Sequence, residues 1–381
     1  MPLHRRWTLR CFDCARAVAV AAACLLVLAG CGSPYPFDPF PPRVRSPALG
    51  EVRRDYALIK LFYATDRART WSQSPLDFYG TDRAAAVNLG TCDVSIPATH
   101  GRGALEEPGL LVPPRPERHV LLLNVSPPEP ADGFFERLRP AVERSESRAL
   151  MVFVHGYNVT FAEAARRAAQ IAHDVEFEGV AMLYSWPAQG FLLGYLVDGV
   201  NAEWSSVNLE RFLQDVRKRS GAQRIHLLAH SMGTRVVSGA VRELVRDEPP
   251  TAENRFAQIV IAAGDMDAQI FERDYAPALA AAADRVTLYV SGADWALGGS
   301  RRLHRYSRLG ELGIPANGAP WRERFDVIDA TAVDKGVVGH VYYGSSPTIL
   351  QDLGGVLGGA PPIERGLMAR DDVFVVAPAG R

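Results

Sequence analysis

The sequence predicts an α/β protein built on a mostly parallel, doubly wound β-sheet with helices on both faces. Short apolar, β-branched segments alternate with longer segments in which apolar residues recur at helical spacing. Several of the short segments are almost continuously apolar, as strands buried on both faces should be. The chain has 381 residues, of which 48% are hydrophobic, so it can bury a large core around such a sheet.

The order of the expected elements follows this alternation. After Gly354 the chain is rich in Gly and Pro, and we expect a loosely packed tail. The segment 65–118 is rich in Gly, Pro and polar residues, which favours irregular or antiparallel structure at a sheet edge. The expected strands are Ala57–Tyr63, His119–Val125, Ala149–Val154, Gly179–Tyr184, Arg224–Leu228, Gln258–Ala262, Arg285–Val290 and Arg324–Ile328, and the expected helices are Phe161–Phe177, Trp204–Arg219, Gly233–Arg246 and Ala268–Ala283.

The charge balance argues against nucleic acid as a partner. The chain carries 42 basic and 43 acidic residues, a formal net charge of −1. Proteins that bind nucleic acid normally have a clear basic excess.

The first 30 residues have the pattern of a secretory signal peptide. Arginines precede an uninterrupted apolar run, 17–28, that is shorter than the ~20 residues of a membrane-spanning helix. The following Leu28–Cys31 stretch resembles the bacterial lipoprotein box. That resemblance implies cleavage before Cys31 and attachment of acyl chains such as palmitate to this cysteine. It also implies a place in the cell envelope, at the periplasmic face of the outer membrane, since no aspartate directly follows Cys31.

The remainder of the chain divides into three parts. Residues 31–50 contain six prolines after Cys31, a composition typical of an extended tether. We expect the α/β domain over 51–350 and the Gly- and Pro-rich tail over 351–381.

The cysteines predict neither a disulfide nor a metal site. Cys11, Cys14 and Cys24 leave with the signal peptide and Cys31 carries lipid, so only Cys92 remains. Cys11 and Cys14 have the spacing of half a zinc site, but they lie in the discarded segment without a second half.

Ser231 stands in the sequence context of a nucleophile elbow. The apolar segment Ile225–Leu228 leads into Ala229-His230-Ser231-Met232-Gly233, and a helical pattern follows. A tight strand-to-helix turn requires small residues two before and two after the serine, and Ala229 and Gly233 meet this requirement. The backbone N–H of Met232 would then point at an oxyanion beside Ser231.

A serine nucleophile needs a base and an acid that orients the base, which in this topology follow in the order Ser, acid, His. Asp294 follows the expected strand Arg285–Val290, and His340 follows the last expected strand. Asp265 and Asp267 follow the preceding strand and are alternative acids, unless they cap the next helix.

Other histidines fit the role of base less well. His304 lies in an arginine-rich helical segment, and His230 precedes the nucleophile, where the elbow turns adjacent side chains apart. His155 begins the His155-Gly156-Tyr157 turn after a buried strand, where a histidine usually fixes the loop. The backbone of Tyr157 is the expected second oxyanion donor, and Trp186, at the end of the next strand, is expected either to pack or to contact substrate.

These motifs together resemble a bacterial α/β-hydrolase family of undefined substrate whose members include lipoproteins. The resemblance covers roughly Tyr56 to Tyr343, including Phe62–Arg67 and Gly339–Tyr343. It implies an α/β-hydrolase fold, a triad of Ser231, Asp294 and His340, and an esterase-like activity without metal or organic cofactor.

Two other functions remain open on the sequence. A non-catalytic envelope protein could keep the fold as a binding scaffold, and a lipase or cutinase-like enzyme would prefer long acyl chains. The favoured hypothesis is a lipid-anchored serine hydrolase that acts on small acyl esters.

Overall fold

The computed structural model describes residues 50–191, 194–311, 319–334 and 340–377. The expected signal peptide, Cys31 and all of the expected tether except Gly50 lie outside these residues. Within them, no helix combines the length and the apolar character needed to cross a bilayer.

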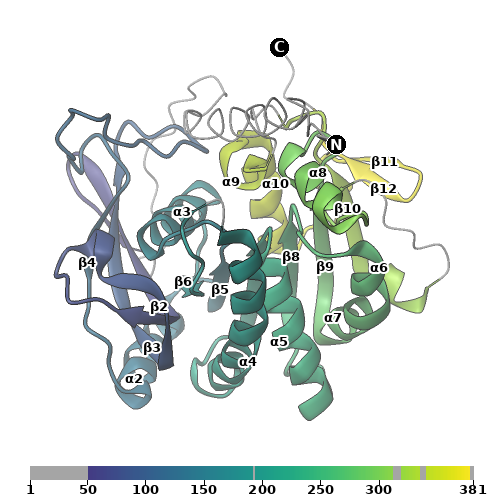
Figure 1. Ribbon diagram of the computed structural model, residues 1–381, viewed down its shortest axis with the longest axis horizontal. Helices are drawn as coiled ribbons and strands as arrows, with labels where there is room; N and C mark the ends of the chain where they lie inside the picture. Colours follow the sequence, from purple (N-terminus) through teal and green to yellow (C-terminus); the bar gives the residue numbers. More distant parts are fainter. Residues whose placement is uncertain (1–49, 192–193, 312–318, 335–339, 378–381) are drawn as a thin grey trace, which may run out of the picture. The chain divides into compact units, whose positions relative to one another are not determined.

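The described strands form one 12-stranded sheet that is parallel at its centre (Figure 1). Its order is β11-β12-β10-β9-β8-β7-β5-β6-β2-β3-β4, and β1 pairs with β2. The strands are β1 Gly50–Val52, β2 Tyr56–Arg69, β3 Tyr79–Pro97, β4 Leu121–Val125, β5 Ala149–Val154, β6 Val180–Ser185, β7 Arg224–His230, β8 Phe256–Ala262, β9 Ala283–Val290, β10 Phe325–Asp329, β11 Met368–Arg370 and β12 Val373–Val375.

Helices cover both faces of this sheet (Figure 1). The core on one face contains side chains of α3, α9 and α10, and the core on the other face contains side chains of α2, α4, α5 and α7. Every residue of β5 and β6 is buried, which explains their nearly continuous apolar sequence. The helices are α2 Ala131–Arg144, α3 Phe161–Asp174, α4 Tyr195–Arg219, α5 Gly233–Asp247, α6 Ala268–Ile270, α7 Ala276–Ala282, α8 Trp295–His304, α9 Tyr342–Ser345 and α10 Pro347–Gly358, with short helical turns η2 Pro75–Asp77, η4 Phe271–Tyr275 and η5 Pro320–Arg324.

The eight expected strands all form, seven of them within two residues of their predicted ends, whereas β2 continues six residues beyond the predicted end at Tyr63. The predicted helix Ala268–Ala283 is wrong in detail, because a π-helical turn, η4, separates α6 from α7 and residue 283 already belongs to β9. Helix α4 begins at Tyr195, nine residues before the prediction. Helix α2 was not predicted; it contains Pro140, a residue that sequence reasoning takes as a helix breaker.

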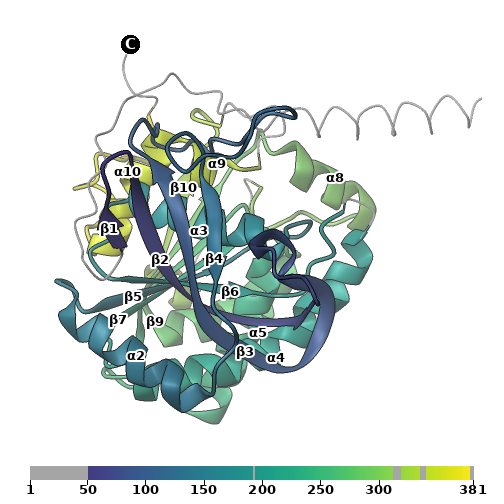
Figure 2. The same ribbon diagram turned by 90° about the vertical axis from the view of Figure 1, so that its left-hand side faces the viewer.

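Part of the segment expected to be irregular is a long antiparallel strand. β3 pairs with β2 from Tyr56 to Arg69, and Figure 2 shows the two strands curving together. Two register shifts after Thr65 accompany this curvature. The antiparallel alternative was therefore right for 79–97, whereas 98–118 contains no strand or helix.

The tail is not loosely packed over its described part. The expected boundary at residue 350 falls inside α10, whose residues Leu353, Val356 and Leu357 are buried in the core. β12 then pairs in parallel with β10 and extends the sheet. Pro347 begins α10 and Gly359 caps its end, whereas Gly354 and Gly355 lie within the helix.

Candidate active site

Ser231 lies in the tight turn between β7 and α5. Its φ is 51°, in the left-handed region that residues with a side chain rarely adopt. A Cβ atom on Gly233 would lie 2.5 Å from the carbonyl oxygen of His155, so only glycine lets α5 approach the end of β5 this closely. Ala229 is fully buried at the other small position. The local geometry is that of the predicted elbow.

The structure brings Ser231, His340 and Asp294 into one chain of hydrogen bonds. Nε2 of His340 lies 2.7 Å from Oγ of Ser231, and Nδ1 of His340 lies 2.8 Å from Oδ2 of Asp294. These residues follow β7, β10 and β9, whose carboxyl ends meet at one edge of the sheet. The side chain of Asp294 is fully buried, and that of His340 is 12% exposed.

Two opposing effects act on the pKa of His340. Burial lowers this pKa, whereas the charge of Asp294 and the hydrogen bond to it raise it. The net result is a pKa above the ordinary value for histidine. The imidazolium form is thus stabilised, as a base that takes a proton during a reaction requires.

The alternative acids have other partners. Both oxygens of Asp265 are engaged, with Nε of Arg308 at 2.8 Å and the hydroxyls of Tyr195 at 2.5 Å and Ser300 at 2.7 Å. The charge of Arg308 overcomes the effect of burial and lowers the pKa of Asp265. Asp267 caps α6 by accepting two backbone N–H groups. Neither carboxylate forms a hydrogen bond with His340 among the described residues.

The two remaining candidate histidines also have defined contacts. Nδ1 of His304 lies 3.0 Å from the carbonyl oxygen of Ser300 within α8. Nε2 of His230 lies 3.0 Å from the carbonyl oxygen of His340, and its ring stacks on Tyr343 with centroids 4.0 Å apart. Burial, reinforced by His340, keeps the pKa of His230 well below the usual range. The neutral His230 therefore supports the backbone that carries His340.

The loop after β5 runs beside the nucleophile. A Cβ atom on Gly156 would lie 2.9 Å from Cβ of Ser231, so this loop, with the half-buried Tyr157, touches the elbow. Met232 is fully buried, and its backbone N–H forms no hydrogen bond within the part of the chain that the structure describes. That N–H is available to an oxyanion.

His155 and Trp186 are buried supports of this loop. Nδ1 of His155 lies 2.8 Å from the carbonyl oxygen of Gly156, and Nε2 lies 3.1 Å from Oγ of Ser185. The indole of Trp186 stacks on His155 and donates to its carbonyl oxygen at 2.7 Å. Burial, with the nearby charge of Arg67, lowers the pKa of His155 to about 3. Trp186 has no exposed surface, so packing is its role in this structure.

Sequence reasoning missed the contribution of Arg67. Its fully buried guanidinium donates to the carbonyl oxygens of Val159 at 2.6 Å, Ala188 at 3.0 Å and Gly80 at 3.1 Å, and to Oγ of Ser185 at 2.9 Å. Arg67 thereby ties the loop after β5 to the ends of β2 and β6. The signal was an arginine shortly after an apolar strand segment, but its carbonyl partners cannot be identified from sequence.

One buried cluster has the residue types of a metal site. Ligand atoms of His100, His173 and Asp174 lie within 4.8 Å of one another. Both ring nitrogens of His100 already lie 2.8 Å from carboxylate oxygens, of Glu106 and Asp174. Although burial opposes the charge, these two acids raise the pKa of His100 to about 10. The cluster is thus a buried ion pair that fastens the 98–106 loop to α3.

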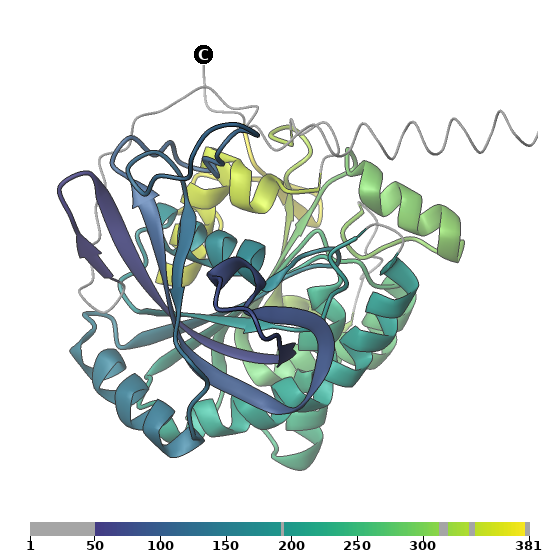
Figure 3. The same ribbon diagram turned by 60° about the vertical axis from the view of Figure 1, so that its left-hand side comes forward.

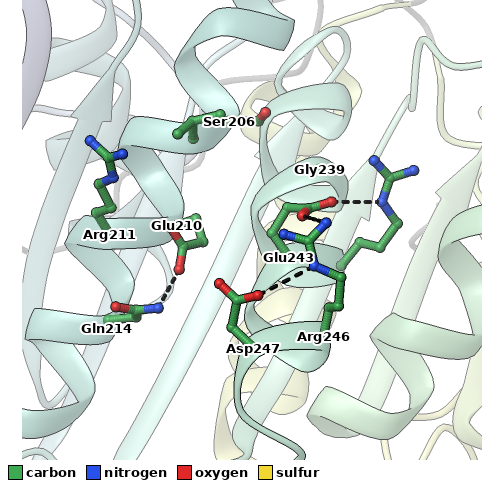
Figure 4. Close-up of a pocket in the computed structure, with 10 residues that line it drawn as sticks. Ser206, Glu210, Arg211, Gln214, Gly239, Glu243, Arg246 and Asp247 are labelled. Carbon is green, nitrogen blue, oxygen red and sulfur yellow. Dashed lines mark hydrogen bonds and ion pairs between the residues drawn. The ribbon is translucent and has the colours of Figure 1, made fainter.

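Two hollows lie apart from the triad. One groove between α4 and α5 has a volume of about 480 Å³ and is lined by residues of both charges, among them Glu210, Arg211 and Glu243 (Figure 4). The other, of about 340 Å³, lies beside Asp174 and α10. Neither is lined by Ser231, His340 or Asp294.

Residues 132–356 match the model of a family described as alpha/beta hydrolase of unknown function, DUF900. The match covers more than half of the chain and includes Ser231, Asp294 and His340. The chain belongs to this family. The protein therefore has the α/β-hydrolase fold, the scaffold of the DUF900 hydrolases.

Solved structures similar to this DUF900 chain include wild-type AbyA5, with 18% identity and a TM-score of 0.32. That match covers 57% of this chain and 62% of AbyA5, so the chain spans less than two thirds of it. A lipase-esterase related protein from Clostridium acetobutylicum ATCC 824 matches with 14% identity and a TM-score of 0.24, over 54% of this chain and 82% of that protein. No curated protein matched the chain.

Proposed function

We propose that this DUF900 protein is a serine hydrolase that cleaves carboxylic esters. The observation that carries the proposal is the hydrogen-bond chain from Ser231 through His340 to Asp294, with distances of 2.7 and 2.8 Å. A hydroxyl within reach of an imidazole that is itself oriented by a buried carboxylate is the arrangement that makes serine a nucleophile.

The first half of the proposed reaction forms an acyl-enzyme. Nε2 of His340 accepts the hydroxyl proton of Ser231 while Oγ attacks the acyl carbonyl carbon. The backbone N–H groups of Met232 and Tyr157 donate to the developing oxyanion. His340 then returns the proton to the oxygen of the leaving alcohol, and the ester bond breaks.

The second half uses water as the nucleophile. His340 takes a proton from the water as the water attacks the acyl carbon, and then protonates Oγ of Ser231 as the carboxylic acid leaves. Asp294 stays ionised and stabilises the imidazolium in both halves. Every step uses side chains or backbone groups of this chain.

The proposed location follows from the N-terminal sequence. Lipid on Cys31 would anchor the protein in a bacterial envelope, at the periplasmic face of the outer membrane. The Pro-rich residues 32–50 would separate the domain from the anchor. Small acyl esters are the proposed substrates.

Labelling with a fluorophosphonate probe tests the enzymatic proposal. We expect the wild-type protein to be labelled and Ser231→Ala to lose the label. Ser206→Ala is a suitable control, because Ser206 lies on α4 and donates only to the carbonyl oxygen of Glu203. A folded wild-type protein without label would favour a non-catalytic binding scaffold.

A series of nitrophenyl esters tests the substrate class. Faster hydrolysis of short acyl chains than of long ones supports a small-ester hydrolase, whereas the reverse order supports a lipase. No hydrolysis across the series would count against both.

A further inference from the structure

Helix α8 presents large apolar side chains to solvent beside the triad. Trp295 is 75% exposed and Leu303 is 60% exposed, and Tyr306 just beyond the helix is 58% exposed. On the inner side of the helix, Leu297 and Ser300 are buried. Figure 3 shows α8 projecting at the margin of the fold. Large apolar side chains gathered on one exposed helix indicate a surface that binds something.

Basic side chains accompany these apolar residues. Arg301, Arg302 and Arg305 are exposed, and Arg301 lies 3.4 Å from Glu311. Arg302 and Arg305 form no ion pair with any residue that the structure describes. The exposed face of α8 is therefore apolar and positively charged, although the chain as a whole has a net charge of −1.

Apolar side chains are also exposed at the beginning of α4, which lies next to α8. Tyr195 joins the two helices, because its hydroxyl lies 2.9 Å from Oγ of Ser300 and its ring centroid lies 5.7 Å from that of His304. In the next turns of α4, Leu196 and Val200 are exposed.

We propose that the exposed face of α8 and of the two residues after it, made of Trp295, Arg302, Leu303, Arg305 and Tyr306, docks on an anionic lipid bilayer. Tryptophan and tyrosine favour the boundary between lipid headgroups and acyl chains, and leucine enters the acyl region. Arginines near the membrane surface are attracted to anionic headgroups. The combination of interfacial aromatic rings, leucine and arginines without ion-pair partners among the described residues favours an anionic bilayer as the occupant.

The length of chain before the described domain permits this docking. The 18 residues from Gly32 to Leu49 would span ~56 Å at ~3.1 Å per residue, the rise of an extended Pro-rich chain. If Cys31 carries lipid, the domain can therefore reach the same bilayer. The contribution of α8 does not depend on that anchor.

Docking through α8 would place the triad at the membrane. Asp294 immediately precedes α8, and Val341, next to His340, is 44% exposed. Small acyl esters at the bilayer surface would then lie near the triad, and this consequence rests on the proposed hydrolase function. The docking itself does not, because it requires no turnover.

Quenching of tryptophan fluorescence by brominated lipid tests the docking. The full chain carrying Ser231→Ala is mixed with vesicles of phosphatidylethanolamine and phosphatidylglycerol whose acyl chains are brominated. We expect quenching that Trp295→Phe largely removes. Trp71→Phe is the matched control, because Trp71 is fully exposed on the turn after β2, five strands from β9 in the sheet order, and should leave the quenching unchanged.

The charge requirement is tested separately. Replacing phosphatidylglycerol by phosphatidylcholine, or making the double variant Arg302→Glu and Arg305→Glu, should reduce the Trp295-dependent quenching several-fold. Arg144→Glu with Arg148→Glu is the charge-matched control, since both arginines are exposed before β5, away from the carboxyl edge.

Two results would overturn the proposal. Equal quenching with and without Trp295→Phe in the Ser231→Ala protein would mean that α8 does not contact the bilayer. Trp295-dependent quenching that changes neither with lipid charge nor in the Arg302→Glu and Arg305→Glu double variant would refute the specificity for anionic lipid. Because Ser231→Ala is used throughout, failure of docking stays distinct from failure of the hydrolase proposal, which fluorophosphonate labelling of wild type decides.

Discussion

Oδ2 of Asp294 lies 2.8 Å from Nδ1 of His340, while Oδ1 of the same carboxylate accepts a hydrogen bond from the backbone N–H of Leu297 at 3.0 Å. The residue that orients the proposed base is therefore also the N-cap of α8. This double role fixes the carboxylate in one orientation and couples the triad to the helix beside it.

The pH dependence of hydrolysis should reflect Asp294. Because Asp294 raises the pKa of His340, we expect kcat/KM to fall on acidification with a midpoint above the ordinary histidine value of ~6.5. In Asp294→Asn the asparagine still caps α8, but the negative charge is gone and burial lowers the pKa. The midpoint should move to lower pH, and turnover should fall by ~10³ to 10⁴-fold.

Asp267→Asn is the control for this change. Asp267 also caps a helix but does not contact His340, so its replacement should cost at most ~1 kcal/mol of stability and leave the pH midpoint in place. A larger loss of turnover in Asp265→Asn or Asp267→Asn than in Asp294→Asn would move the acid one strand earlier.

His230 should act as a positioning residue for His340. In His230→Phe an aromatic ring can still stack on Tyr343, but the donor to the carbonyl oxygen of His340 is lost. We expect kcat to fall roughly fivefold with little change in KM, since loss of one hydrogen bond costs about 1 kcal/mol. His230→Gln, which keeps an N–H donor, should recover part of kcat. Equal kcat in the two variants would show that packing alone matters.

Local residue patterns predict one part of the candidate site, whereas contacts between distant segments determine the other part. Ser231 was predictable because the elbow is a local pattern of small residues between a strand and a helix, and His340 because the topology orders the triad. Asp265 could not be excluded from sequence, since its partner Arg308 lies 43 residues away and only the fold brings them together. The same limit applies to Arg67, whose carbonyl partners come from several loops.

The buried ion pair of His100 predicts a pH-dependent stability. The pKa of His100 is raised to about 10, so its contribution is complete below pH ~6.5 and is lost as the pH rises through about 10. The pKa of Asp174 is lowered, because His100 overcomes the effect of burial, so its contribution is present above pH ~4 and lost below. The pair should therefore stabilise the fold most between pH ~4 and ~6.5.

Urea unfolding of His100→Gln measures this contribution. The substitution removes the cationic partner of the buried Asp174, although Gly103 and Gln170 still donate to that carboxylate. Breaking a buried ion pair in this way costs about 3–5 kcal/mol. The difference from wild type should be largest near pH 5.5 and shrink toward pH 10. The double variant with Asp174→Asn should lose less than the sum of the single losses, and a difference that does not vary with pH would refute the ionic interpretation.

Replacing Cys31 by serine tests the proposed anchor. The substitution removes the thiol that would carry lipid, so the metabolic incorporation of labelled palmitate into the protein should disappear. Residues 51–377 contain the proposed triad, and we therefore expect the specific activity on a short nitrophenyl ester to stay unchanged. Because α8 is proposed to touch anionic lipid by itself, salt should release the serine variant from membranes and leave the wild type bound. A serine variant that resists salt as well as the wild type does would contradict anchoring through Cys31.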